Sequence, residues 1–186
     1  MSHPNRLEQG RAALLLIDVQ ERLFSAMAEG TRARRLARLI ALVQGARALE
    51  LPVIWTEQYP KGLGPTVSSL QTELEGISPW SKTSFSCLGD RAIAQAIRDT
   101  GRDQWLVAGM ETHICVLQTV RDLREDQHEA HLIVDGCMSR NPVDYEVGIK
   151  RADALGASLS SVETCLFELL GQAGGEAFKT ISRAIR

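Results

Sequence analysis

Residues 12–18 read Ala-Ala-Leu-Leu-Leu-Ile-Asp, an unbroken apolar run that ends on a carboxylate. A run this short and this uniformly apolar is typical of a β-strand buried on both faces. Similar runs recur at residues 53–56, 105–108, 131–134 and 157–162. Longer segments with helical periodicity separate them. This alternation predicts the α/β class, with a parallel sheet covered by helices on both sides.

The segments between the apolar runs have the spacing and end signals of helices. In residues 31–50 the side chains of Leu36, Ile40 and Val43 share one helical face. Asn141 followed by Pro142 is a typical helix start. Residues 57–85 are rich in Gly, Pro, Ser and Thr, and we expect a long connection there with one strand near residues 81–83. Helices are expected over residues 31–50, 90–100, 112–124, 141–156, 163–170 and 176–185.

Length, composition and charge narrow the possible function classes. The 186 residues predict a single domain over residues 1–186, and 44% hydrophobic with 24% charged residues is typical of a folded protein. The net charge of -2 gives no overall attraction to nucleic acid or to an anionic membrane. No apolar run approaches the ~20 residues of a membrane span, and the first ten residues are polar, unlike a signal peptide. We therefore expect a cytoplasmic protein that binds neither nucleic acid nor membrane.

Metal and nucleotide motifs are missing from the sequence. The cysteines form no C-x-x-C pair, and the histidines form no H-E-x-x-H motif. There is also no G-x-G-x-x-G and no G-K-[ST] sequence. We therefore predict no metal and no cofactor, and we expect reduced thiols in a cytoplasmic setting.

The predicted sheet places several polar residues along one edge. In open parallel sheets, ligands bind beyond the carboxyl ends of the strands. Asp18 ends the first run, Glu57 follows the second, and Lys82 lies in the short strand of the long connection. The fourth run leads into residues 109–115, Gly-Met-Glu-Thr-His-Ile-Cys. An acid, a base and a potential nucleophile are thus expected to converge on this edge.

Cys115 is the strongest candidate nucleophile. With Thr112 as the expected N-cap, Cys115 falls in the first turn of a helix, where the helix dipole favours an anion and lowers the pKa of a thiol. The residues that follow on its helical face, Gln118, Thr119 and Asp122, are polar. The alternative is a buried structural thiol, which is how we interpret the remaining cysteines, Cys87, Cys137 and Cys165.

Asp18 and Lys82 gain a role only beside Cys115. Alone, Asp18 could be a solvated carboxylate or a helix cap, and most lysines are solvated surface charges. Next to Cys115, Asp18 could accept the thiol proton. A lysine in the same cleft would favour the thiolate through its charge. The combination therefore predicts nucleophilic catalysis more strongly than any single residue does.

Three blocks of the chain, in this order and spacing, resemble the isochorismatase-like cysteine hydrolases. The blocks are residues 14–20 (LLLIDVQ), Lys82, and residues 109–116 (GMETHICV). The resemblance covers roughly residues 11–162. Residues 56–66 and 82–87 resemble a narrower branch, the isochorismatase domain-containing proteins.

This resemblance implies a fold, a set of site residues and an assembly. It implies a three-layer α/β/α fold with a six-stranded parallel sheet in the order 3-2-1-4-5-6, and a homo-oligomer. It assigns an Asp–Lys–Cys triad to Asp18, Lys82 and Cys115. It also implies a cis peptide between Met110 and Glu111, and an oxyanion hole from the backbone N–H groups of Glu111 and Cys115. Loop position together with the resemblance suggests a substrate pocket formed by Gln20, Phe24, Glu57, Tyr59, Phe85 and Thr112.

The sequence departs from nicotinamidases, a group within this superfamily. They have an Asp-x-His metal pair after the second strand, where this chain reads Glu57-Gln-Tyr-Pro. We expect a cysteine hydrolase that cleaves a small amide or related C–N bond through a thioester. One alternative is hydrolysis of an isochorismate-type vinyl ether with Asp18 as general acid. Another is a catalytically silent scaffold or interaction module.

Overall fold

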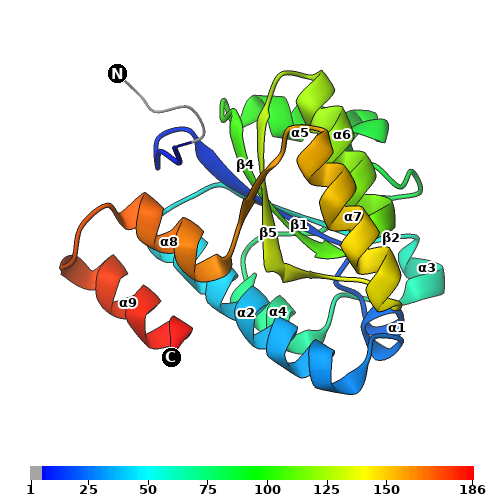
Figure 1. Ribbon diagram of the computed structural model, residues 1–186, viewed down its shortest axis with the longest axis horizontal. Coiled ribbons are helices and arrows are strands. Elements are labelled where there is room, and N and C mark those ends of the chain that lie inside the picture. The colour runs from blue at the N-terminus through cyan, green and yellow to red at the C-terminus, as the bar shows by residue number, and fades with distance from the viewer. Residues whose placement is uncertain (1–5) are drawn as a thin grey trace.

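A computed structural model of the chain describes residues 6–186. A six-stranded sheet lies at its centre in the order β3-β2-β1-β4-β5-β6, with every neighbouring pair parallel (Figure 1). The strands are β1 (Ala12–Ile17), β2 (Val53–Gln58), β3 (Trp80–Lys82), β4 (Gln104–Met110), β5 (Glu129–Met138) and β6 (Ser158–Ser160). The predicted α/β class, six-stranded parallel sheet and strand order are therefore confirmed.

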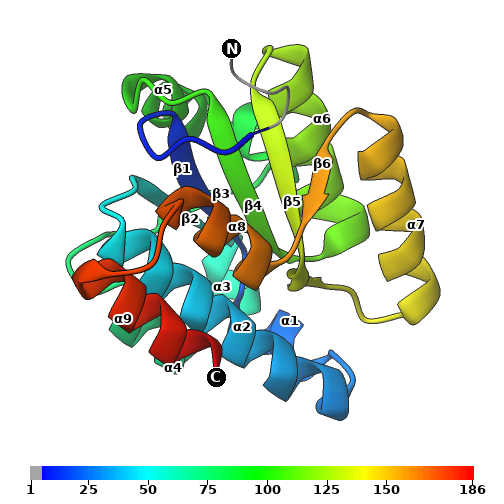
Figure 2. The same cartoon turned by 60° about the vertical axis from the view of Figure 1, so that its left-hand side comes forward.

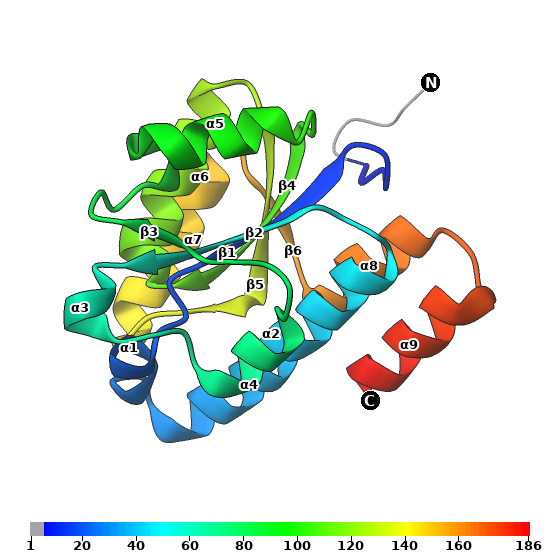
Figure 3. The same cartoon turned by 180° about the vertical axis from the view of Figure 1, so that it is seen from behind.

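Helices cover both faces of this sheet (Figures 1 and 3). One layer contains α2 (Glu29–Ala48), α4 (Ser68–Glu73), α8 (Val162–Leu170) and α9 (Gly175–Ile185). The opposite layer contains α5 (Arg91–Asp99), α6 (Leu117–Glu125) and α7 (Pro142–Ala154). Two short helices, α1 (Glu21–Ser25) and α3 (Pro60–Leu63), follow the carboxyl ends of β1 and β2. Figure 2 shows the edge strand β6 between α7 and α8.

The side chains of β1 divide between two hydrophobic cores. Leu14 and Leu16 pack into the core on the α2 side, whereas Leu15 and Ile17 pack into the core on the α5 side. Every residue of β1 is buried. Alternate side chains of a strand point to opposite faces, so a central strand needs apolar residues at every position. Burial on both faces explains why residues 12–17 are apolar at every position.

The helix predicted over residues 112–124 is divided in the structure. Residues Thr112–Val116 form a π-helical turn, in which the Val116 N–H donates to the Glu111 carbonyl 3.3 Å away, and α6 begins at Leu117. The prediction of Thr112 as N-cap is wrong, because Glu111 occupies that position and its side chain forms no capping bond. A widened turn adds a residue without changing the apolar stripe that follows, so periodicity does not reveal it.

The connection between β2 and α5 has more structure than expected. The predicted strand near residues 81–83 is found as β3, but α3 and α4 precede it where we expected an irregular segment. The sequence also gave no sign of α1. Helices of one or two turns present too few apolar positions to show a period. The final strand is shorter than the predicted residues 157–162, because the Ser161 hydroxyl caps α8 by accepting from Thr164 N–H at 3.2 Å.

Two further expectations concern the chain as a whole. Among residues 6–186, no helix is both long enough and apolar enough to cross a membrane. The single domain over residues 1–186 stays a prediction, and residues 1–5 lie outside the part that the structure describes.

Candidate active site

A buried ion pair lies at the carboxyl edge of the sheet. Lys82 Nζ is 2.6 Å from Asp18 Oδ2, and both side chains are fully shielded from solvent. Burying an ion costs several kcal/mol unless partners replace its hydration. Here Asp18 Oδ1 accepts a 2.6 Å hydrogen bond from the Thr56 hydroxyl. Lys82 also donates to Gln58 Oε1 at 2.8 Å and to the Phe85 carbonyl at 3.0 Å.

Three adjacent strands deliver these groups. Asp18 directly follows β1, Thr56 and Gln58 lie on β2, and Lys82 is the last residue of β3. Thr56 and Gln58 are two residues apart, so they share a face of the strand. Neither residue was predicted for the site from the sequence, although a Thr-x-Gln alternation at the end of an otherwise apolar strand is a usable signal of polar partners at this edge.

The backbone at the end of β4 allows a close approach to β1. Gly109 has φ 126°, and a Cβ at this position would collide with the carbonyl oxygen of Ile17. Only glycine fits such a contact. Asp18, which directly follows the neighbouring strand β1, has φ 52°, a left-handed conformation that Asp adopts more readily than most residues. The peptide bond between Met110 and Glu111 is cis. The turn carrying Cys115 begins immediately after it.

Cys115 is buried, and the expectation of a lowered pKa is wrong. Burial raises the pKa of the Cys115 thiol, and Asp18 raises it further through its charge and hydrogen bonding, whereas the Lys82 ammonium lowers it. Desolvation and a neighbouring carboxylate both disfavour a thiolate. They outweigh the helix dipole, which acts here on an irregular π-helical turn. The surroundings of Cys115 thus favour the neutral thiol, and the charges of Asp18 and Lys82 act on its pKa in opposite directions.

A second buried thiol lies on the same side of the sheet. Cys87 Sγ is 3.9 Å from Thr56 Oγ1, and its backbone N–H donates to Thr119 Oγ1 at 3.0 Å. The Thr119 hydroxyl donates in turn to the Cys115 carbonyl at 2.7 Å. Burial, followed by the charge of Asp18, raises the pKa of Cys87 to about 12. The sequence placed Thr119 one turn after Cys115 but gave no reason to connect it with Cys87.

The residues expected to form the substrate pocket have different surroundings. Gln20 is buried, with its Oε1 accepting from Gln58 N–H at 2.7 Å, and Glu57 is buried and accepts from Thr66 N–H at 2.7 Å. Both side chains thus hold the loops around the site. Tyr59 and Phe85 are about half exposed at the edge, Phe24 packs partly buried against the core, and Thr112 is buried.

Glu111 forms a second ion pair at this edge. Its side chain is 5% exposed, and its Oε1 accepts from both Arg140 Nε at 3.0 Å and Arg140 N–H at 3.1 Å. Arg140 belongs to the loop between β5 and α7. The Glu111 carboxylate therefore ties this loop to the segment that leads into Cys115.

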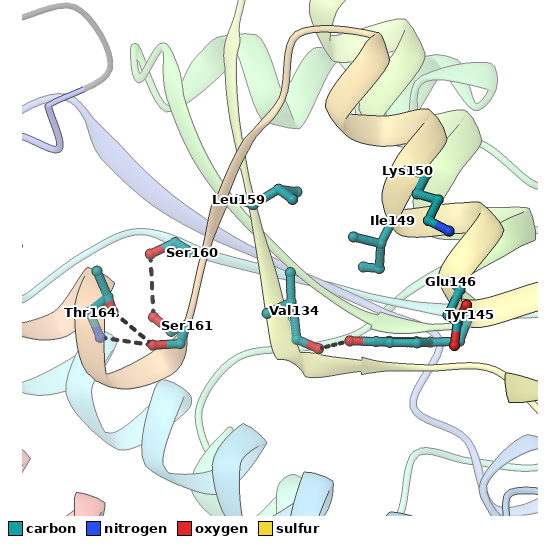
Figure 4. A pocket seen from close by; sticks show the side chains of 9 residues that line it. All are labelled: Val134, Tyr145, Glu146, Ile149, Lys150, Leu159, Ser160, Ser161 and Thr164. Carbon is teal, nitrogen blue, oxygen red and sulfur yellow. Dashed lines mark hydrogen bonds between the residues drawn. The ribbon is translucent and has the colours of Figure 1, made fainter.

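An apolar groove of about 560 Å³ lies away from these ion pairs, between α7 and the β6–α8 connection (Figure 4). Val134, Tyr145, Ile149 and Leu159 line it, and none of the predicted site residues does. Among residues 6–186, no group of three or more His, Cys, Asp or Glu side chains is arranged to hold a metal ion.

The chain is similar to known proteins in both sequence and fold. The family model of the isochorismatase domain matches residues 12–164. The chain belongs to the isochorismatase domain family. It is 37% identical to isochorismatase domain-containing protein 2 of Bos taurus over 97% of this chain and 86% of that protein. The family is one of hydrolases, and the resemblance proposed from the three sequence blocks is confirmed.

Solved structures of similar proteins share the fold. A structure described as MAR1 ribonuclease from Caenorhabditis elegans has a TM-score of 0.89 at 32% identity, covering 97% of this chain and 92% of that one. YcaC from Pseudomonas aeruginosa, described with hexane-2,5-diol and covalent acrylamide, has a TM-score of 0.91 at 25% identity, covering 99% and 93%. YcaC from Escherichia coli, described as an octameric hydrolase, has a TM-score of 0.85 at 22% identity, covering 92% and 85%.

Proposed function

We propose that this family member is a cysteine hydrolase that cleaves a small amide or related C–N bond. Cys115 is the nucleophile, Asp18 is the general base and then the general acid, and Lys82 fixes and balances the charge of Asp18. The observation that carries the proposal is the fully buried pair of Asp18 and Lys82, 2.6 Å apart, at the sheet edge where Cys115 is also buried. The pKa of the Cys115 thiol is raised by the charge of Asp18 and lowered by that of Lys82. A thiol that is neutral at rest needs a base at hand, and the paired carboxylate supplies one.

The reaction proceeds in two halves. In the first, the thiol proton moves to Asp18 as Sγ bonds to the substrate carbonyl carbon. The backbone N–H groups of Glu111 and Cys115 receive the oxyanion, each contributing about 3 kcal/mol to transition-state stabilisation. The C–N bond then breaks, and the amine leaves with the proton from Asp18. In the second half, water gives a proton to Asp18 and attacks the thioester, and the cysteine sulfur leaves and recovers that proton.

The substrate pocket is assigned to residues at the same edge. Tyr59 and Phe85 provide half-exposed aromatic surface, Phe24 is partly buried against the core, and Thr112 is buried. The Thr112 hydroxyl is buried without a partner among residues 6–186, so a substrate polar group can satisfy it. Covalent acrylamide on the P. aeruginosa YcaC supports a nucleophilic side chain in that relative, because acrylamide adds to nucleophiles through its C=C bond and keeps its amide intact. The net charge of -2 favours such a substrate over RNA, despite the name of the C. elegans neighbour.

Intact-mass analysis during turnover tests the proposal. A panel of small amides and carbamoyl compounds is incubated with the wild-type chain and with Cys115→Ala, and the matched control is Cys165→Ala, a buried cysteine on α8. We expect an acyl adduct on the wild type and the control and none on Cys115→Ala. Hydrolysis of a confirmed substrate by Cys115→Ala at near wild-type rate would contradict the covalent route. An inert Cys115 against the whole panel would favour a scaffold role.

A second candidate reaction is hydrolysis of an isochorismate-type vinyl ether, with Asp18 as general acid and Cys115 a bystander. The raised pKa of the Cys115 thiol favours it, because a protonated sulfur is a poor nucleophile. Cys115→Ala separates the two reactions. It abolishes amide cleavage but leaves ether cleavage within a few-fold of wild type, whereas Asp18→Asn abolishes both.

We also propose that the protein is a cytoplasmic homo-oligomer. The groove of Figure 4 combines the apolar Leu159, 44% exposed, with Glu146 and Lys150 on one face of α7. In a two-fold contact, Glu146 of each copy meets Lys150 of the other, so the groove is complementary in charge to itself. Light scattering of wild type and Leu159→Asp tests this. Identical masses for both proteins, or a monomeric wild type, would refute an interface at this groove.

A further inference from the structure

A small cavity lies beyond the carboxyl end of β5, between α2 and the start of α7. Its volume is about 140 Å³, and Arg34, Arg35 and Arg140 line it without any Asp or Glu in the lining. Pockets for drug-sized ligands occupy ~300–1,000 Å³. This cavity therefore suits a single small group, and its charge favours an anion.

The arginines of the cavity are not all neutralised by partners. Arg140 is balanced by Glu111. Arg34 is exposed and, within residues 6–186, makes no ion pair, unlike its neighbours Arg32 with Glu29 and Arg38 with Asp135. Arg34 thus has all of its donors free for a ligand.

Arg35 is fixed in place by two hydrogen bonds, and it has a buried donor that remains unused. Its Nη1 donates to the Val134 carbonyl at 2.7 Å, its Nη2 lies 3.2 Å from the Tyr145 hydroxyl, and its guanidinium carbon is 5.2 Å from the centre of the Tyr145 ring. Its Nε is buried and has no hydrogen-bond partner among residues 6–186. A buried donor without a partner costs free energy that an oxyanion in the cavity can recover.

Hydroxyl groups and a helix end add to the arginines. Thr31 and Ser139 line the cavity, and the Ser139 hydroxyl lies 2.9 Å from His113 Nδ1. Pro142, the first residue of the 13-residue helix α7, also lines it. The dipole of this helix favours negative charge at its N-terminus, although Pro142 has no N–H to donate and the Val143 N–H already donates to Asn141 Oδ1 at 3.0 Å. Arginine charge, an unmet buried donor and the helix end therefore point to the same kind of ligand.

We propose that this cavity is a binding site for a small oxyanion, either a phosphate or a carboxylate group. The site is separate from Cys115 and does not depend on the proposed hydrolysis. It is nevertheless adjacent to the candidate active site, because Arg140 both lines the cavity and holds Glu111. Arginine is well suited to the role, since its planar fork matches the oxygens of either group.

Calorimetric titration of the full chain tests the site. Inorganic phosphate and acetate are titrated separately into wild type, Arg34→Gln and Arg151→Gln at constant ionic strength, with chloride as the blank. Arg151 is an exposed arginine of α7 outside the cavity lining, so its variant controls for net charge. We expect saturable binding at one site, weakened about tenfold by Arg34→Gln and less than twofold by Arg151→Gln.

The two titrations identify the source of the oxyanion. Tighter phosphate binding indicates a phosphate group, tighter acetate binding indicates a carboxylate, and either supports the site. No saturable heat from either anion, or equal weakening in both variants, would overturn it. Thermal unfolding of Arg34→Gln checks that the variant is folded. Cys115→Ala is expected to bind the anion like wild type, so this result stands whether or not the hydrolase proposal holds.

Discussion

Two ion pairs at the carboxyl edge of the sheet differ mainly in their access to water. Asp18 and Lys82 are 2.6 Å apart with neither side chain exposed. Glu111 and Arg140 are 3.0 Å apart, but the Arg140 side chain is 58% exposed. In the first pair only protein groups replace the hydration of the two charges, so removing one charge leaves the other buried without a counter-ion. In the second, water can take over part of the contact. The difference separates a pair that only protein groups solvate from a pair that holds a loop at the surface.

Breaking the buried pair is expected to have the largest effect. Lys82→Met leaves Asp18 buried without its counter-ion, and we expect the free energy of unfolding to fall by about 3–5 kcal/mol. Urea unfolding followed by circular dichroism measures it. The double variant Asp18→Asn with Lys82→Met removes both charges and should recover part of the loss. Equal destabilisation in the single and double variants would show that charge burial is not the cause.

Removing the proposed nucleophile is expected to have the second-largest effect. Cys115→Ala should lower kcat/KM for a confirmed amide substrate on the order of a thousandfold or more, since residues that form a catalytic unit lose most activity when one is removed. Cys165→Ala should stay near wild type. Steady-state kinetics of both variants gives the ratio. Comparable losses in the two would assign the effect to core packing rather than to the thiol beside the buried pair.

The buried thiols predict a loss of stability in alkaline solution. The pKa of Cys87 is raised from an ordinary 9.0 to about 12, so the folded protein keeps a proton that the unfolded chain releases. The contribution of this thiol to the free energy of unfolding therefore has its full value below pH 9 and decreases from there up to about pH 12. The slope is about 1.4 kcal/mol per pH unit for each such thiol. Urea unfolding between pH 8 and about pH 10.5 should show a shallower decline in Cys87→Ala than in wild type, and parallel curves would contradict the assignment.

Disrupting the exposed pair should have the smallest effect. Arg140→Ala removes one of two hydrogen bonds to Glu111 and leaves the one from the residue 140 backbone N–H. We expect a loss of about 1 kcal/mol in the free energy of unfolding. The same urea assay measures it, and 0.5 M salt should narrow the gap to wild type because exposed charges are screened. A loss as large as that of Lys82→Met would show that solvent exposure does not separate the two pairs.

Much of the architecture could be predicted from the sequence because it depends on local patterns. The apolar run that became β1, the proline at the start of α7 and the periodicity of α2 each act within a few residues. The short helices α1, α3 and α4 escaped prediction because one or two turns carry almost no period. The map of polar residues along the strand ends worked because parallel strands bring their carboxyl ends to one edge.

The direction of the pKa shift at Cys115 could not be predicted from local sequence patterns in the same way. The prediction for Cys115 considered a helix dipole but not the dielectric around the sulfur. Burial and the charge of Asp18, from a segment almost a hundred positions away, reverse the direction of the pKa shift. The contacts of Thr56 and Thr119 were missed for a related reason, since a hydroxyl in a strand or helix gives no sign in the sequence of the partner it will meet.

By itself, the sequence determined the sheet, the alternation of helices around it and the identity of the polar groups at its carboxyl edge, because hydrophobic periodicity and strand direction are properties of short segments. Only the tertiary structure decided that Asp18 and Lys82 are completely buried, that burial and the charge of Asp18 raise the pKa of Cys115, and that three arginines line a small cavity. Those outcomes depend on desolvation and on Coulomb interactions between remote segments, and both are set by distances that exist only after the chain has folded.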